Sequence, residues 1–409
     1  MSVPGAEEWR AEQAQALLAT GRRIVRPDGR FGWISDEGTD DETQPRFPYI
    51  SARMTHVWAL AHLNGDAPDG AKIAADGIAS FADWADPAHG GWYAALDPAG
   101  RPLDRNKAAY EHAHMMLASS SATAAGLPGA AELLAALCET VARWFWSDDE
   151  GATLESWNED FTEPEPYRGA NSNMHSVEAY LAAGDVTGDP VWHARALSMA
   201  ELLINRFARG NGWRIPEHYD AKWHPLPDFN RDRPFDRFRP CGTTPGHSFE
   251  WSRLCVNLAA TLPDPPSWLV EAAIGLFDTA AADAWAVDGR SGFIYTLDSN
   301  HRPLNPARMH WVVCEAIMAA DALHRRTGDA HYADIAKPWW AFLDEHIIDH
   351  TRGGWWNELS AQLTPTHDSW AGKPDMYHCY QTLLFPSLPS SPCAAVILAR
   401  RAADGGAGD

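Results

Sequence analysis

The sequence has few basic residues and no long apolar run, and these two absences exclude several classes of protein. Only 33 of its 409 residues are Lys or Arg against 55 Asp or Glu, so a formal net charge of -22 would repel nucleic-acid phosphates and anionic lipid surfaces. No stretch approaches the ~18 apolar residues that suggest a membrane span, and the opening residues have neither region of a secretion signal. We therefore expect no nucleic-acid or membrane partner and a cytoplasmic location.

Cysteine is also scarce, and its spacing indicates no cross-link. Six cysteines are scattered without a CxxC pair, which is typical of reduced, buried thiols. A Gly-rich phosphate loop and a strong nucleophile motif are missing as well. His112 and His114 are alternate residues that point about 200° apart on a helix, so we expect no metal there.

What the sequence does contain is an internal repeat. A glycine near an aromatic residue leads into a short polar hairpin six times, with separations of 59, 60, 61, 80 and 62 residues. The marker glycines are Gly32, Gly91, Gly151, Gly212, Gly292 and Gly354. Between hairpins, Ala- and Leu-rich stretches predict two helices per repeat.

Six helix pairs predict an all-α fold, because pairs that cannot bury their own apolar faces must stack as an open solenoid or close into a ring. Closure removes exposed ends, so we predict a single (α/α)6-barrel domain over residues 1–409, with short β-hairpins at one end. The inner helices are expected at 51–64, 106–125, 171–184, 246–262, 307–327 and 375–385. The outer helices are expected at 71–85, 130–147, 190–208, 267–285, 330–347 and 392–402, after an opening helix at 6–20.

The one long interval contains a Pro- and Arg-rich segment, residues 226–247. An insertion of this kind at one barrel mouth suits a lid or a pocket wall.

Polar and titratable side chains gather at the predicted starts of the inner helices, which all lie at one end of a closed barrel. Helix N-termini there would favour polyhydroxy or partly anionic ligands. The residues are Arg53, His56, Tyr110, His112, His114, Asn171, His175, His247, Glu250, Arg308, His310, Trp311, Tyr377 and His378. Because seven of the 18 histidines share this layer, we interpret it as a polar functional cavity rather than packed core.

Two of these histidines suit proton transfer. His247 and Glu250 are three residues apart on one helix, so the carboxylate is expected to lie beside the imidazole and orient it. His378 follows Pro374, which suits the first turn of a helix. Imidazole has an ordinary pKa of about 6.5, so two such groups could give and take protons near neutrality.

At these residues the sequence resembles the N-acylglucosamine 2-epimerase superfamily, and within it the aldose–ketose isomerase branch. The likeness covers nearly the whole chain and rests on ARMTHVWAL, GGWYAALDPAGRPLDRNKAAYEHAH, YRGANSNMHSVEAYL, FRPCGTTPGHSFEWSRL (with Arg239), ARMHWVVCEA and GKPDMYHCYQ. The resemblance implies an (α/α)6 barrel that moves a proton between carbons of a monosaccharide, with no metal and no other cofactor.

The resemblance also implies roles for individual residues. His247 would be the acid–base for ring and carbonyl oxygens, and His378 would shuttle a proton between C2 and C1 through a cis-enediol. Charge on the substrate oxygens would be stabilised by Arg53, Arg237 and His175. The remaining implied substrate-binding residues are Tyr110, Asn171, Glu250, Trp311 and Glu358.

The choice of sugar depends on two features. The long 226–247 segment resembles the isomerase branch rather than the simple 2-epimerases, and it could leave room for a monosaccharide but not for an extended disaccharide. Asn357 and Glu358 lie near the position that, by this resemblance, meets the far end of the sugar, where a carboxylate would repel a sulfonate. If Glu358 faces the pocket, we predict interconversion of D-mannose and D-fructose. Because Arg53 places a cation in the site, sulfoquinovose isomerase remains an alternative function. A sugar 2-epimerase is the other alternative.

Two alternatives come from other classes. A glycoside hydrolase on the same barrel needs a pair of carboxylates in the cavity, where this sequence places histidines. A helical-repeat interaction protein would use an open concave surface instead. The sequence leaves open whether the chain is a monomer or a homodimer.

Overall fold

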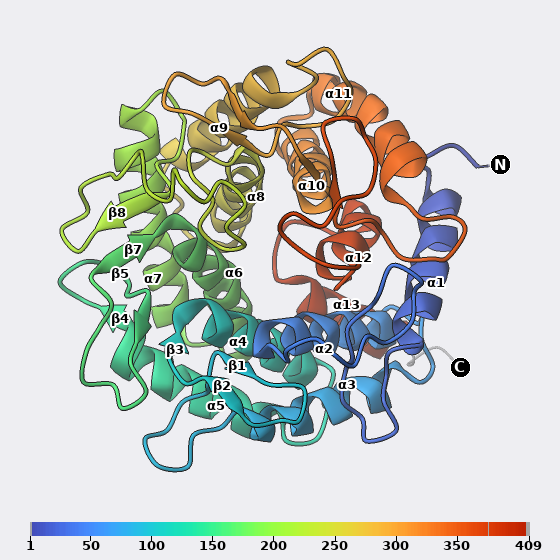
Figure 1. Ribbon diagram of the computed structural model, residues 1–409, viewed down its shortest axis with the longest axis vertical. Coiled ribbons are helices and arrows are strands. Elements are labelled where there is room, and N and C mark those ends of the chain that lie inside the picture. The colour runs from blue at the N-terminus through green and yellow to red at the C-terminus, as the bar shows by residue number, and fades with distance from the viewer. Residues whose placement is uncertain (1, 375, 406–409) are drawn as a thin grey trace.

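In the computed structural model, which describes residues 2–374 and 376–405, the helices form two concentric rings (Figure 1). The inner ring consists of α2 (Pro48–Leu63), α4 (Ala109–Ala124), α6 (Ala170–Thr187), α8 (Pro245–Thr261), α10 (His310–Thr327) and α12 (Tyr377–Leu384). The outer ring consists of α3 (Gly70–Ser80), α5 (Ala130–Thr140), α7 (Pro190–Ala200), α9 (Trp268–Ala284), α11 (Ala330–Phe342) and α1 (Glu7–Arg22). Since α12 contacts both α10 and α2, the inner ring is closed and the (α/α)6 prediction is confirmed.

The two rings differ in how they bury their side chains. In α2 every residue from Pro48 to Ala61 is buried, as expected of a helix that is surrounded by protein. In α3 the buried residues recur at helical spacing, among them Ile73, Ala74 and Ile78, so one face packs inward. A Cβ at Gly77 would lie 2.2 Å from the Thr55 hydroxyl oxygen, so glycine permits this close approach of α3 to α2.

The last helix pair differs from the prediction. A helix does form near 392–402, as α13 (Ala394–Gly405), but it packs against α2 and α4 instead of taking an outer position. The outer place beside α12 belongs to α1, so the opening helix completes the sixth pair (Figure 1). Repeat spacing pairs neighbours along the chain, and it could not reveal a pair made from the two chain ends. The expected helix 375–385 is α12; residue 375 lies outside the described residues.

Short hairpins connect the outer helices to the inner ones and therefore lie at the end of the barrel where the inner helices begin. In the described chain the strands form six two-stranded antiparallel sheets. They are β1 (Ala95–Leu96), β2 (Pro102–Asp104), β3 (Lys107–Ala108), β4 (Trp146–Ser147), β5 (Ala152–Thr153), β6 (Ser156–Trp157), β7 (Tyr167–Gly169), β8 (His218–Asp220), β9 (Thr296–Leu297), β10 (Pro303–Asn305), β11 (Arg308–Met309) and β12 (Glu358–Leu359).

Three of these strands, β3, β7 and β11, lead directly into the inner helices α4, α6 and α10. Each pairs with a strand of the following repeat, for example Met309 with Glu358. The pairing fixes where each inner helix begins and hence where its first side chains point. None of the described helices has the length and apolar character needed to cross a membrane.

Candidate active site

A cavity of about 680 Å³ lies at the end of the barrel where the inner helices begin. Nine of the ten predicted site residues line it: Arg53, Tyr110, Asn171, His175, Arg237, His247, Glu250, Trp311 and His378. The sequence did not predict seven further lining residues as part of the site, Tyr49, Phe238, Pro240, Tyr295, Met309, Trp370 and Pro374. Asn357, expected near the far end of the sugar, also lines the cavity, and His310 had no role beyond its place in the polar layer. The predicted convergence of this layer is therefore correct for most of its members.

Some members of the layer point elsewhere. His112 is buried behind the cavity, where its Nδ1 lies 2.7 Å from the Ala108 carbonyl oxygen. His114 packs its ring against His175, with 4.4 Å between ring centroids. Arg308 is buried and pairs with Asp288 through a 2.7 Å contact. Successive helix residues turn by about 100°, so a shared position at a helix start does not ensure a shared direction.

His247 is oriented by a carboxylate that sequence reasoning missed. Its Nδ1 lies 2.8 Å from the Glu217 Oε2, and the other carboxylate oxygen accepts from the Thr244 N–H at 3.1 Å. The prediction that Glu250 orients His247 is therefore wrong. An intrahelical spacing of three residues allows such a contact, but the Glu217 carboxylate reaches the ring from the hairpin, 30 residues earlier in the same repeat.

Glu217 occupies a position that recurs among the hairpins of the structure. The hairpin residues Glu155, Glu217 and Asn357 occupy equivalent places, because each backbone carbonyl accepts from the first N–H of an inner helix. The Glu155 carboxylate accepts from the Gly169 N–H at the start of α6, just as that of Glu217 does at the start of α8.

Glu250 lies instead beside His175, with 3.6 Å between Oε1 and Nδ1. Both carboxyl oxygens of Glu250 are buried without a hydrogen-bond partner in the described chain. Burial, together with the nearby Glu315, raises the pKa of Glu250 well above its ordinary value, so the neutral acid is favoured. Burial and neighbouring cations lower the pKa of His175 well below its usual range, so this pair is neutral.

His378 is held in the same manner as His247. Its Nδ1 lies 2.9 Å from the Glu315 Oε1, and the other oxygen of that carboxylate lies 3.1 Å from the Arg253 Nε. Both Glu315 and Arg253 are buried. Glu315 is 63 residues from His378 in the sequence, and no local motif links the two.

Trp311 lies between the two imidazoles. Its ring centroid is 5.1 Å from that of His247 and 5.9 Å from that of His378, with interplanar angles of 32° and 35°. An indole face in this position offers an apolar platform for the C–H groups of a ligand held between two hydrogen-bonding rings.

Arg53 supplies a cation on the opposite wall. Its Nη2 donates to the Tyr110 hydroxyl at 3.0 Å, and its guanidinium lies 4.8 Å from the Tyr377 ring centroid. Its side chain is buried, so aromatic faces replace water around the charge.

The segment predicted as an insertion forms part of the cavity wall through Arg237, Phe238 and Pro240. The Arg237 Nε donates to the Ser369 carbonyl oxygen at 2.8 Å, and its guanidinium lies 4.8 Å from the Trp370 ring. Two loops far apart in the sequence thus meet over the cavity.

Other predicted contacts on this side have structural partners. The Asn171 Nδ2 donates to the Phe238 carbonyl oxygen at 3.4 Å, beneath the insertion. Arg239 does not line the cavity: its guanidinium pairs with Glu165 at 2.6 Å.

Glu358 is the predicted site residue that does not line the cavity. It is buried in β12, where its Oε2 accepts from the Ser369 N–H at 2.9 Å, and burial raises its pKa. It therefore supports the loop that Arg237 contacts. The choice of a neutral sugar depended on Glu358 facing the pocket, and it does not line the cavity. Repulsion of a sulfonate by Glu358 therefore gives no reason to choose mannose.

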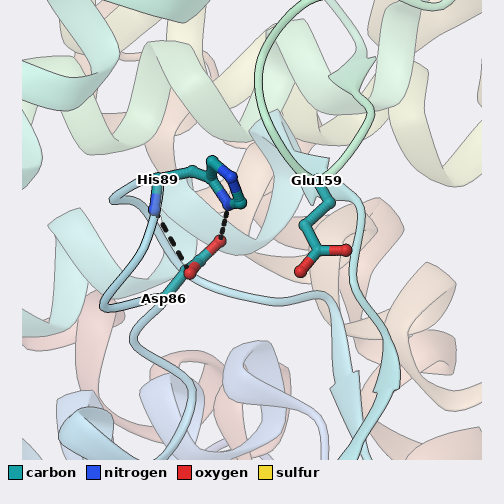
Figure 2. Close-up of side chains that lie close together, drawn as sticks. All are labelled: Asp86, His89 and Glu159. Carbon is teal, nitrogen blue, oxygen red and sulfur yellow. Dashed lines mark hydrogen bonds and ion pairs between the residues drawn. The ribbon is translucent and has the colours of Figure 1, made fainter.

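Within the described residues, two groups of side chains come close enough together to be considered for a metal ion: Asp86, His89 and Glu159, and His175, Glu178 and Glu250. Figure 2 shows the first group, in which the His89 ring and backbone both contact the Asp86 carboxylate, at 3.2 Å and 3.3 Å. The buried ammonium of Lys107 lies 2.9 Å from the same carboxylate and already balances its charge. The second group shares its space with the Arg253 guanidinium, 3.4 Å from Glu178. We assign a metal to neither group.

Comparison with known proteins agrees with this geometry. The family model of N-acylglucosamine 2-epimerase (GlcNAc 2-epimerase) matches residues 29–382. A D-mannose isomerase of Thermobifida fusca is 44% identical over 393 residues, covering 96% of each chain. A D-mannose isomerase of Pseudomonas cannabina pv. alisalensis is 43% identical over 402 residues, covering 97% of this chain and 96% of the relative. A crystal structure of a D-mannose isomerase superposes with a TM-score of 0.88 at 28% identity, covering 94% of this chain and 99% of that one.

Proposed function

The chain belongs to the N-acylglucosamine 2-epimerase family, and we propose that it is an aldose–ketose isomerase that interconverts D-mannose and D-fructose. The observation that carries this proposal is the pair of imidazoles, His247 and His378, on either side of Trp311, each held at Nδ1 by a carboxylate. The choice of mannose rests on the two relatives that are 43–44% identical over nearly their full length.

In the proposed reaction, His247 transfers protons to and from the ring oxygen and the carbonyl oxygen, so that the sugar ring opens. The Nε2 of His378 then takes the proton from C2, and the electron pair of that bond forms the C1=C2 bond of a cis-enediol while the π pair of the C1 carbonyl moves to O1, which takes a proton from His247. The C1=C2 electron pair then takes the proton back from His378 at C1, while O2 gives its proton to His247 and becomes the carbonyl oxygen of the ketose. Only protons move, so the steps require no redox partner, and we propose that the reaction is independent of metal.

The charge that develops on the substrate oxygens needs positive partners. Arg53 is a buried cation in the cavity wall, and Arg237, an exposed residue of the insertion, is a second cation that lines the cavity. Fixed charges in a site that excludes water stabilise a transition state more than they would in water. We propose that Arg53, Arg237 and His175 bind the oxygens and that Tyr110, Asn171, Glu250 and Trp311 position the sugar.

We further propose that residues 226–247 act as a lid together with the loop that carries Trp370, in a protein that acts in the cytoplasm. Glu358 would serve as a positioning residue for that loop.

The glycoside hydrolase alternative requires two carboxylates in the cavity. Of the carboxylates in the described residues, only Glu250 lines it, and its raised pKa favours the neutral acid. The site therefore offers no acid–nucleophile pair.

Proton NMR in deuterated water tests the proposal directly. Chelator-treated protein should convert D-mannose to fructose, with deuterium entering C1 or C2 to some extent. Glucose without fructose would indicate a 2-epimerase, and conversion of sulfoquinovose without conversion of mannose would indicate the sulfosugar branch. Either result would contradict the proposal.

The role of Glu217 can be tested with Glu217→Gln. Because the neutral amide no longer stabilises the positive charge that His247 carries after taking a proton, kcat should drop about 10–100-fold, as expected for a charge-assisted hydrogen bond. The measurement is kcat and KM with mannose, and the KM should change little. Glu155→Gln is the matched control, since its carboxylate contacts Gly169 and Ser172 rather than a cavity histidine. Equal losses of kcat in the two variants would contradict the assignment.

A further inference from the structure

A second cavity, of about 790 Å³, lies on the barrel axis at the end opposite the active site. It is lined by residues from the C-terminal halves of the inner helices, among them Asp185 of α6, Thr261 of α8 and Asp321 of α10. The segment after α12 and the first turn of α13 cover it, through residues such as Phe385 and Ala395. The proposed reaction uses none of this space.

The wall of the second cavity nearest the active site is polar and rigidly held. The His56 Nδ1 lies 2.7 Å from the Ser121 Oγ, and the Gln381 Nε2 lies 3.2 Å from the His56 Nε2. The side chain of Gln381 is fully buried, and its Oε1 has no hydrogen-bond partner in the described chain. Burial lowers the pKa of His56 to about 4, so this ring is neutral near pH 7. An unpartnered buried carbonyl oxygen that lines a cavity is a position for a donor from a ligand.

The carboxylates that line this cavity outnumber the cations that line it. Glu178, Asp185 and Asp321 line it against the one guanidinium of Arg253, which is itself shared with Glu250 and Glu315. His193 and Arg325 lie beside two of these carboxylates, at 3.2 Å from Asp185 and 2.8 Å from Asp321. The inner helices also end here, and helix C-termini carry partial negative charge.

The remaining walls are apolar, with Leu117, Leu181, Met318 and Leu388 around Phe385. Apolar walls with a few convergent polar groups are typical of sites for small organic molecules. We propose that this cavity is a second ligand site that binds a small organic cation, a primary amine with a short alkyl body, and that it can be occupied together with the active site.

In the bound state the ammonium would donate to the Gln381 Oε1 and face the Glu178 carboxylate, while the alkyl chain would lie along Leu117, Met318 and Phe385. Binding at this cavity is measured without turnover, and only the competition with fructose rests on the proposed function.

The test uses the full-length protein and three probes that share a six-carbon chain: n-hexylamine, hexan-1-ol and hexanoate. Calorimetry and thermal unfolding should show that hexylamine binds at least about tenfold more tightly than hexanol, a difference of about 1.4 kcal/mol, and that hexanoate does not bind. Saturating fructose should leave the affinity for hexylamine unchanged. Loss of hexylamine binding in the presence of fructose would place the amine in the active site and overturn the proposal.

Two variants make the assignment specific. Ala322→Phe fills the cavity from α10, and Gln381→Leu removes the acceptor while keeping a similar volume; each should weaken hexylamine binding at least tenfold. If one variant fails to fold, the other still decides. Equal binding of hexylamine and hexanoate, no binding of hexylamine to the unaltered protein, or unchanged affinity in a folded variant would each overturn the proposal.

Discussion

The His378→Asn variant is expected to fold normally and to lose about 10²–10⁴-fold in kcat for mannose, the usual contribution of one positioned acid–base group. The reason is that the Nδ1 of His378 is held by Glu315 in a wall of the cavity, so the ring is positioned to move one proton between adjacent carbons. Asparagine retains a polar side chain of similar length but has no group that titrates near neutrality. The measurement is the initial rate of fructose formation together with the KM, which should change little.

The control for this prediction is Glu315→Gln, which keeps the acceptor beside His378 and removes only its charge. It should lose less activity than His378→Asn, because the imidazole remains. Thermal unfolding of both variants in the presence of fructose separates loss of chemistry from loss of binding. Turnover of His378→Asn within a few fold of the unaltered protein would show that another group carries the proton. His247→Asn is expected to fall to a similarly low rate, because the sugar ring would no longer be opened.

The fold could be predicted because the sequence contains an internal repeat, and each copy of the repeat encodes the same structural unit. Hairpin glycines recur at nearly equal spacing, and apolar stretches between them have the length of helices. What failed was the sixth pair, where the outer helix is α1 rather than α13. The local sequence pattern predicts each helix, but it does not predict which helix occupies the outer position beside α12.

In the site, too, some features could be predicted from the sequence and others could not. His247, His378 and Trp311 could be identified because they lie in motifs, and the structure brings them together. The carboxylates that orient the histidines could not, since Glu217 and Glu315 are 30 and 63 residues away from their partners. Glu358 shows the opposite case: it lies in a motif, and a place in the cavity was predicted for it. In the structure, strand β12 directs its carboxylate toward the Ser369 N–H instead. Side-chain direction depends on strand pairing, which motif spacing does not encode.

The Arg253→Met variant is expected to lower the free energy of unfolding by about 3–5 kcal/mol, the usual cost of removing one partner from a buried ion pair. Arg253 is buried between three carboxylates, 3.1 Å from Glu315, 3.4 Å from Glu178 and 3.8 Å from Glu250. Burial alone would lower the pKa of Arg253, but these carboxylates raise it above its ordinary value, so the guanidinium stays charged. Without it, the buried carboxylate of Glu315 would lose its cation in a medium that screens charge weakly.

The pH dependence of this loss distinguishes charge from packing. Burial already raises the pKa values of Glu250 and Glu315, and in the variant these pKa values should rise further above their unfolded values, so the folded state binds more protons and its stability falls as the pH rises. The deficit relative to the unaltered protein should therefore be larger at pH 8 than at pH 5, in urea unfolding at both values. Arg209→Met is the matched control, since Arg209 pairs with the exposed Glu271 at 2.7 Å and should cost no more than about 1 kcal/mol. The loss of stability in Arg253→Met could equal that in Arg209→Met, or it could fail to grow with pH. Either result would mean that the ion pairs of Arg253 do not stabilise the barrel as inferred.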